Sequence, residues 1–188
     1  MIPIDDPTQV QHYRELAREM MLPQNGKEYE FAPEWISKRG WKVVPVESAS
    51  RLRTSEIPRV IAALKRAGYT QCLAVVTEAG YLEPLSPENE RLGDSPTCYR
   101  LALEKADFQD FNRQLGLFRS VLTDDSRSWA ISCNESYNLF GGKIELLEAL
   151  LGEPIEMAQK EFLEFASLLA KGNPDEPLMR VATRYAVL

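Results

Sequence analysis

The chain has 188 residues, of which 44% are hydrophobic and 27% are charged. This composition is typical of a soluble globular protein and excludes global disorder, a collagen-like repeat and a coiled-coil rod. Its 22 Lys and Arg residues against 28 Asp and Glu residues give a net charge of −6. Nucleic acids and anionic membranes attract proteins with excess positive charge, so we expect neither as a partner.

The residue types that most often carry chemistry are scarce. The chain has one histidine and three cysteines, and no two cysteines form a Cys-x-x-Cys pair. An odd number of cysteines without a secretory signal is typical of reduced thiols in a cytoplasmic protein. No apolar run approaches the ~18 residues of a membrane span. We therefore expect a cytoplasmic protein without a bound metal or cofactor.

The N-terminal segment carries a helix start signal. Asp6 can accept hydrogen bonds from the first free amides of a helix, and Pro7 suits its first turn. Apolar residues then recur at helical spacing as far as Pro23. We predict a helix over residues 7–22.

Two strand patterns follow, with a helix between them. Residues 41–46 read as a strand, and Pro45 indicates either an edge strand or a strand end, because proline has no amide to donate. Residues 72–77 form a short apolar run that is typical of a buried central strand. We predict that Thr54 or Ser55 caps the helix between them.

The second half of the chain predicts antiparallel strands followed by helices. A turn cluster at 124–127 separates two strand patterns, which predicts a hairpin. A third strand ends at the glycine pair 141–142. The other predicted elements are a helix capped by Asp107, helices over residues 143–151 and 154–171, and a helix in the tail 178–188, where the alternation also allows a strand.

These elements predict an α+β fold in a single domain over residues 1–188. The sheet is largely antiparallel and flanked by several helices. Apolar residues at strand spacing should form its core: Leu73, Val75, Val76, Leu101, Leu103, Trp129 and Ile131.

Each residue that could carry chemistry also has a structural explanation. His12 falls outside the apolar stripe of its helix and should face solvent. Cys72 and Cys133 belong to apolar strands, whereas Cys98 borders a loop and should be the exposed, most reactive thiol. The acidic pair 124–125 is more typical of a turn than of a cation site.

Residues 83–97 predict a long irregular loop. The segment contains three prolines and a glycine, which disfavour a regular ladder. Loops of this length in compact domains are usually functional or disordered. We expect an exposed, mobile segment whose candidate partner-contact residues are its four acids, Glu83, Glu88, Glu90 and Asp94.

No motif in the chain is specific enough to name a family. The acidic balance favours a non-enzymatic module that binds a basic protein partner through complementary charge. Bacterial immunity proteins and antitoxins that mask a basic nuclease are acidic binding proteins of this kind. The comparison is by analogy of protein class and rests on no shared motif. One alternative is a small enzyme that uses Cys98 or a pair of carboxylates. Another is a homo-oligomeric scaffold with Trp35, Trp41 or the C-terminal segment at its interface.

Overall fold

Seven strands of the described chain form one antiparallel sheet. The structure is a computed structural model that describes residues 1–188 except 25–27, 49–50, 78–95, 117, 174–175 and 187–188. A separate two-stranded hairpin pairs β2 (Met21–Gln24) with β3 (Glu28–Phe31). The strands of the large sheet lie in the order β1 (Ile2–Pro3), β6 (Cys98–Ala102), β5 (Gln71–Val76), β7 (Ser120–Thr123), β8 (Ala130–Cys133), β9 (Tyr137–Gly142) and β4 (Lys42–Glu47).

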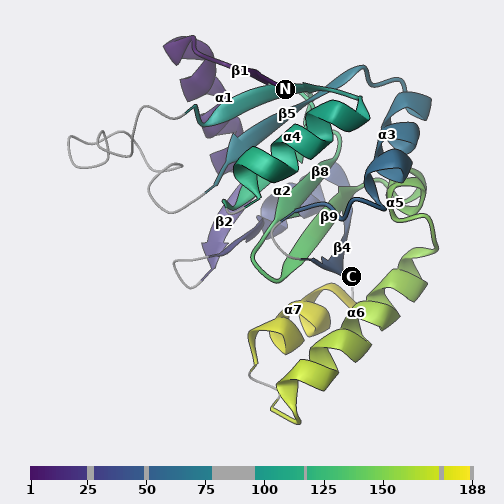
Figure 1. The fold of residues 1–188 in the computed structure, drawn as a ribbon. Helices are drawn as coiled ribbons and strands as arrows, with labels where there is room; N and C mark the ends of the chain where they lie inside the picture. The colour runs from purple at the N-terminus through teal and green to yellow at the C-terminus, as the bar shows by residue number, and fades with distance from the viewer. Residues whose placement is uncertain (25–27, 49–50, 78–95, 117, 174–175, 187–188) are drawn as a thin grey trace.

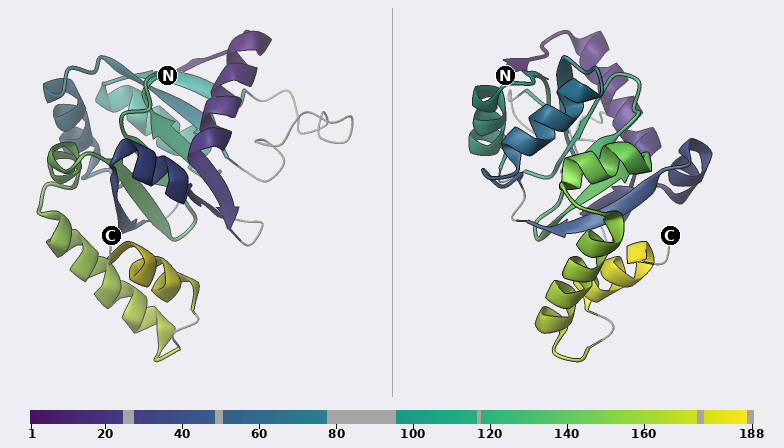
Figure 2. Two further views of the ribbon diagram at one scale, coloured as in Figure 1. Left: turned by 180° about the vertical axis from the view of Figure 1, so that it is seen from behind. Right: turned by 90° about the vertical axis from the view of Figure 1, so that its right-hand side faces the viewer.

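Helices cover both faces of this sheet (Figure 1 and Figure 2). One face packs against α1 (Pro7–Met20), α2 (Pro33–Arg39), α7 (Pro177–Ala186) and the β2–β3 hairpin. The other packs against α3 (Ile57–Arg66), α4 (Lys105–Leu115) and α5 (Ile144–Leu151). The long helix α6 (Ile155–Ala170) contributes to both clusters beside β4. The α+β single-domain fold is therefore confirmed.

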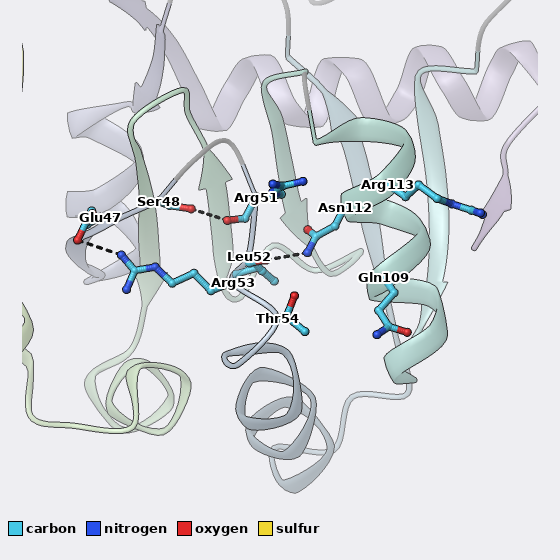
Figure 3. Close-up of a pocket in the computed structure, with 9 residues that line it drawn as sticks. All are labelled: Glu47, Ser48, Arg51, Leu52, Arg53, Thr54, Gln109, Asn112 and Arg113. Atoms are coloured by element: carbon cyan, nitrogen blue, oxygen red, sulfur yellow. Dashed lines mark hydrogen bonds and ion pairs between the residues drawn. The ribbon is translucent and has the colours of Figure 1, made fainter.

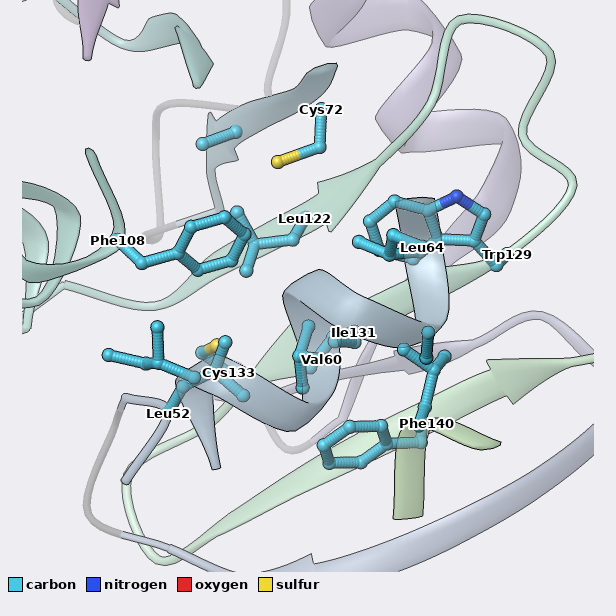
Figure 4. Packing of buried hydrophobic residues seen from close by; sticks show 14 of the residues in the cluster. Leu52, Val60, Leu64, Cys72, Phe108, Leu122, Trp129, Ile131, Cys133 and Phe140 are labelled. Atoms are coloured by element: carbon cyan, nitrogen blue, oxygen red, sulfur yellow. The ribbon is translucent and has the colours of Figure 1, made fainter. Parts of the chain in front are cut away.

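The predicted core residues are all buried. Each of the seven has an exposed fraction of 3% or less, and Trp129 and Ile131 are fully buried. Successive residues of β8 point to opposite faces, so Ile131 joins the cluster shown in Figure 4 whereas Ala130 packs on the other side. Burial on both faces explains why the central strand β5 is apolar at every position from Cys72 to Val76.

The first helix is shorter than predicted. Asp6 caps α1 as expected, because its Oδ1 accepts from the amides of Thr8 at 2.8 Å and Gln9 at 3.1 Å. The helix ends at Met20, however, and residues 21–24 pair with β3. The predicted span 7–22 was wrong at its C-terminal end, because an antiparallel ladder replaces the last helical turn.

Two predicted helix caps were also wrong. Helix α3 begins at Ile57 with Glu56 at the cap position, beyond both Thr54 and Ser55. Glu56 turns back instead, and its Oε2 accepts from the Arg53 amide at 2.8 Å.

Asp107 lies in the first turn of α4, where Glu104 occupies the cap position. Its carboxylate accepts from the Ala102 amide at 2.7 Å and so ties the helix to β6. The third strand ends at the glycine pair 141–142, as predicted, and both glycines still pair with β4.

Other predicted features are observed. Strand β4, which contains Pro45, lies at the edge of the sheet. The tail forms the helix α7, and α5 and α6 lie where helices over 143–151 and 154–171 were expected. No helix in the described part of the chain is long and apolar enough to cross a membrane.

Candidate functional site

A mainly apolar groove opens between α2, the β2–β3 hairpin, the start of β4 and α7. Its volume is about 640 Å³. Concave apolar sites of roughly 300–1,000 Å³ with a few polar groups are typical ligand sites. The lining residues are Leu22, Phe31, Pro33, Ile36, Ser37, Gly40, Trp41, Lys42, Arg184 and Tyr185.

Two aromatic rings form the buried side of this groove. Phe31 and Trp41 have exposed fractions of 2% and 5%, and their ring centroids are 5.7 Å apart in an edge-to-face arrangement. The rings pack over Gly141 in β9. A Cβ atom at Gly141 would lie 2.9 Å from each ring, so glycine is required for this close approach.

The local sequence explains how Trp41 reaches the groove. Gly40 ends α2 with a left-handed φ of 57°, a conformation that glycine adopts without strain. The Trp41 amide then donates to the carbonyl of Ile36 at 3.0 Å. This turn redirects the chain from the helix into β4 and places Trp41 between them.

A buried carboxylate lies behind the α7 wall of the groove. Glu30, with an exposed fraction of 4%, forms an ion pair with Arg184 and accepts from the Tyr185 hydroxyl at 3.0 Å. Burial, followed by the charge of Glu30, raises the pKa of Tyr185. For Arg184, burial lowers the pKa, but Glu30 raises it by more, so both groups keep their protons at neutral pH.

The lining of the groove combines apolar surface with a few polar groups. No histidine, cysteine, aspartate or glutamate lines it. The groove offers apolar surface, which can bury an apolar group, and the cationic donors of Lys42 and Arg184 at its margin.

A second depression, of about 690 Å³, lies between α4 and the segment that follows β4 (Figure 3). It is polar, and two of its arginines are paired: Arg53 with Glu47 at 3.0 Å and Arg113 with Asp110 at 2.8 Å. Asn112 also donates to the carbonyl of Leu52 at 2.7 Å. The Asn112 bond fastens the segment to α4, the Arg53 pair links it to β4 and the Arg113 pair lies within α4, so we assign these contacts a structural role.

The expectation that Cys98 is exposed was wrong. Its side chain is fully buried under α1, with its Sγ 3.9 Å from the carbonyl oxygen of Val10. Burial raises the pKa of Cys98 to about 11 and that of Cys133 to about 12, and it also raises the pKa of Cys72. Burial and the raised pKa both disfavour Cys98 as a nucleophile.

A carboxylate pair, the other enzymatic alternative, occurs beside α6. Glu153 and Glu161 line a cleft of about 70 Å³ with Phe162. Burial, followed by the charge of Glu161, raises the pKa of Glu153. The cleft is far below the volume of roughly 300 Å³ at which ligand pockets begin, so it is too small for a substrate.

The other candidate residues, His12, Trp35 and Trp41, lie on the surface of α1 or in the core. His12 is exposed on α1, as predicted. Trp35 and Trp41, expected at an interface in the scaffold alternative, are 8% and 5% exposed and pack in the core. Among the described residues, no group of three or more His, Cys, Asp or Glu side chains could hold a metal ion.

Asp124 belongs to the β7–β8 turn, as predicted. Its Oδ1 accepts from the amide and hydroxyl of Ser128, both at 2.8 Å, and its Oδ2 accepts from the amide and hydroxyl of Ser126. The partner-contact residues Glu83, Glu88, Glu90 and Asp94 lie outside the described residues.

The sequence did not reveal the groove. Its residues come from segments as far apart as Leu22 and Tyr185. The one local signal was Gly40 followed by Trp41. This pair indicates a turn and an aromatic residue after it, but it does not indicate that the aromatic ring lines a groove. No family model, curated protein or solved structure matches this chain.

Proposed function

We propose that this chain is a non-catalytic binding protein and that its groove, lined by α2, β2–β3 and α7, holds an apolar group. The observation that carries the proposal is the apolar surface that the groove leaves open to solvent. Leu22 keeps 40% of its surface exposed at the margin of the groove. Covering such surface is favourable by about 25 cal/mol per Å².

The neutral dye Nile red, which fluoresces in apolar surroundings, tests the groove directly. Ser37 is an exposed residue of α2 that lines the groove, so Ser37→Phe fills it without entering the core. Thr183→Phe is the matched control, since Thr183 is also exposed and polar but lies outside the groove. We expect saturable dye binding that Ser37→Phe abolishes and Thr183→Phe leaves unchanged. Equal binding to all three proteins contradicts the proposal.

A basic protein is a second candidate partner, favoured by the net charge of −6. An acidic surface steers basic partners over a distance, and salt weakens this attraction. The segment 83–97 concentrates four of these acids, and we propose it as the contact.

Poly-lysine is a suitable probe of this second candidate. The test protein replaces Glu83, Glu88, Glu90 and Asp94 by their amides. A control with the same net charge replaces four exposed glutamates of α5 and α6: Glu145, Glu156, Glu161 and Glu164. We expect salt-sensitive binding that the first set weakens more than the second. Equal weakening would mean that net charge alone attracts the probe and that the segment is not the contact.

A further inference from the structure

A buried carboxylate compensates the arginine that lines the groove. Arg184 of α7 is one of the lining residues, and 46% of its side chain is exposed. Its Nη1 donates to Oε2 of Glu30, which belongs to β3, is buried and does not line the groove. The guanidinium therefore presents to the groove a charge that already has its counter-charge behind it.

The same carboxylate oxygen is held from a second side. The Tyr185 hydroxyl donates to Glu30 Oε2 at 3.0 Å, and Gln159 of α6 donates to the Tyr185 carbonyl at 2.6 Å. A ligand anion that took Arg184 from Glu30 would leave a buried carboxylate without its counter-charge, which is strongly unfavourable. An anion that shared the guanidinium would lie close to a second negative charge. Arg184 is thus committed to Glu30.

The other charges at the groove give a charged ligand no partner either. Lys42, which also lines the groove, is engaged in an interaction of its own. Lys143 lies outside the lining, and its Nζ is 3.5 Å from the carbonyl oxygen of Gly40. Among the lining residues that the structure describes, none is an aspartate or a glutamate that could pair with a cation. A charged head group would lose hydration beside apolar surface without gaining an ion pair.

We propose that the groove selects small neutral apolar molecules, and that Glu30 sets this selectivity by compensating Arg184. This inference rests on the proposed function, because it names the ligand class of the same groove. The volume of about 640 Å³ lies in the range of small-molecule sites. Glu30 is a positioning residue, since it acts through Arg184 and does not itself line the groove.

Three probes with the same chain and different head groups test the selectivity: octanol, octanoate and octylammonium. Calorimetric titration of the full chain at neutral pH gives the affinity for each. We expect octanol to bind about threefold more tightly than either ion, as is typical of the energies of partly exposed charges. Tighter binding of either ion than of octanol would overturn the proposal.

Two reciprocal variants test the role of Glu30. Glu30→Gln keeps an oxygen that can accept from Tyr185 but leaves Arg184 uncompensated, so octanoate should bind about threefold more tightly than to the native protein. Arg184→Gln leaves Glu30 uncompensated, so octylammonium should gain by a similar factor and octanoate should lose. The double variant carries neither charge and should restore the native preference for octanol. A merely structural role of Glu30 predicts no such reversal.

Matched controls change the net charge by the same amount away from the groove. Glu34→Gln on α2 and Arg180→Gln on α7 replace exposed residues that do not line it, and we expect neither to change the order of the three affinities. Urea unfolding establishes that each variant is folded. If Glu30→Gln does not fold, Arg184→Gln, which alters a half-exposed side chain, decides the question against its control.

The outcomes separate this inference from the proposed function. Equal shifts in the groove variants and in their controls, or no shift in either, would overturn the role of Glu30. If Nile red then still binds in a Ser37-dependent way, the groove remains an apolar binding site without charge selection. Absence of binding by all three probes also overturns the inference, and the Nile red result then decides the proposed function separately.

Discussion

The guanidinium carbon of Arg127 lies 4.6 Å from the ring centroid of Trp35. Arg127 also pairs with Glu19 of α1, so one side chain of the β7–β8 turn reaches both α1 and α2. Its backbone has a φ of 53°, in the left-handed region that non-glycine residues seldom adopt. The hydrogen bonds of Asp124 also hold this turn, so the left-handed conformation does not depend on the Arg127 side chain alone.

We predict that Arg127→Ala and Arg127→Gly both lower the unfolding free energy, and that the alanine variant loses more. Arg127→Ala removes both contacts and keeps the strained backbone, whereas Arg127→Gly removes the contacts and relieves the strain. The left-handed conformation costs a non-glycine residue roughly 1–2 kcal/mol, so the glycine variant should be more stable than the alanine variant by about 1 kcal/mol. Urea unfolding of the three proteins measures this order. An alanine variant as stable as the glycine variant would show that the backbone carries no strain.

Gly141 and Gly142 offer a matched test of the groove floor. A Cβ atom at Gly141 would lie 2.9 Å from the rings of Phe31 and Trp41, whereas one at Gly142 would have no contact shorter than 3.5 Å. Gly141→Ala should therefore cost about 1–3 kcal/mol of unfolding free energy through overpacking, and Gly142→Ala should change it little. Thermal unfolding checks the stability, and Nile red binding should fall for Gly141→Ala alone. Similar stability of the two variants would contradict the tight packing under the floor.

The sheet could be predicted because its signal is local. Residues 72–76 are apolar at every position, as burial on both faces requires, and the turn cluster at 124–127 separates two strand patterns. The β2–β3 hairpin could not be predicted by the same reasoning. Met21 continues the apolar stripe of α1 in the sequence. The helix nevertheless ends before it, because Met21 pairs with Phe31 of β3 further along the chain.

The exposure of Cys98 was mispredicted for a related reason. The residue follows a loop-like segment in sequence, but its side chain alternates onto the face of β6 that α1 covers. Which face of a strand a helix covers depends on long-range packing, and no local pattern reports it. The groove depends on such packing at each of its walls.

The thiols provide a direct test of this packing. All three cysteines have exposed fractions of 1% or less. We expect none to react with a maleimide at neutral pH in the native protein, and all three to react within the same time in urea. Mass spectrometry of the labelled protein counts the adducts. Rapid labelling of Cys98 in native buffer would place its side chain at the surface, contrary to the structure.

The β7–β8 turn tests the role of Asp124. Its carboxylate accepts four hydrogen bonds from Ser126 and Ser128, so Asp124→Ala should cost about 1–3 kcal/mol. Asp125→Ala is the control, because Asp125 is exposed and its contact with Arg100, at 3.3 Å, is a surface ion pair of little energy. Calcium should not raise the melting temperature of the native protein. A calcium-dependent rise lost in Asp124→Ala would make this turn a cation site.

The buried thiols also predict how stability depends on pH. Folding raises the pKa of Cys98 from 9.0 to about 11 and that of Cys133 from 9.0 to about 12, because burial disfavours the thiolate. Above pH 9 the unfolded chain therefore loses these protons while the folded chain keeps them, so the unfolding free energy falls as pH rises. Below pH 9 both states hold the protons, and the thiols cause no dependence on pH.

We expect the decline to extend from about pH 9 to the folded-state pKa of each thiol, and to reach roughly 2–3 kcal/mol for Cys98 alone. Cys98→Ala removes its share of the slope, although it lowers the stability at neutral pH by leaving a small cavity. The comparison that matters is the slope between pH 9 and pH 11, measured by urea unfolding. An identical slope in the native protein and in Cys98→Ala would show that the Cys98 thiol ionises as readily in the folded chain as in the unfolded one. Its burial under α1 would then lack the energetic consequence derived from the structure.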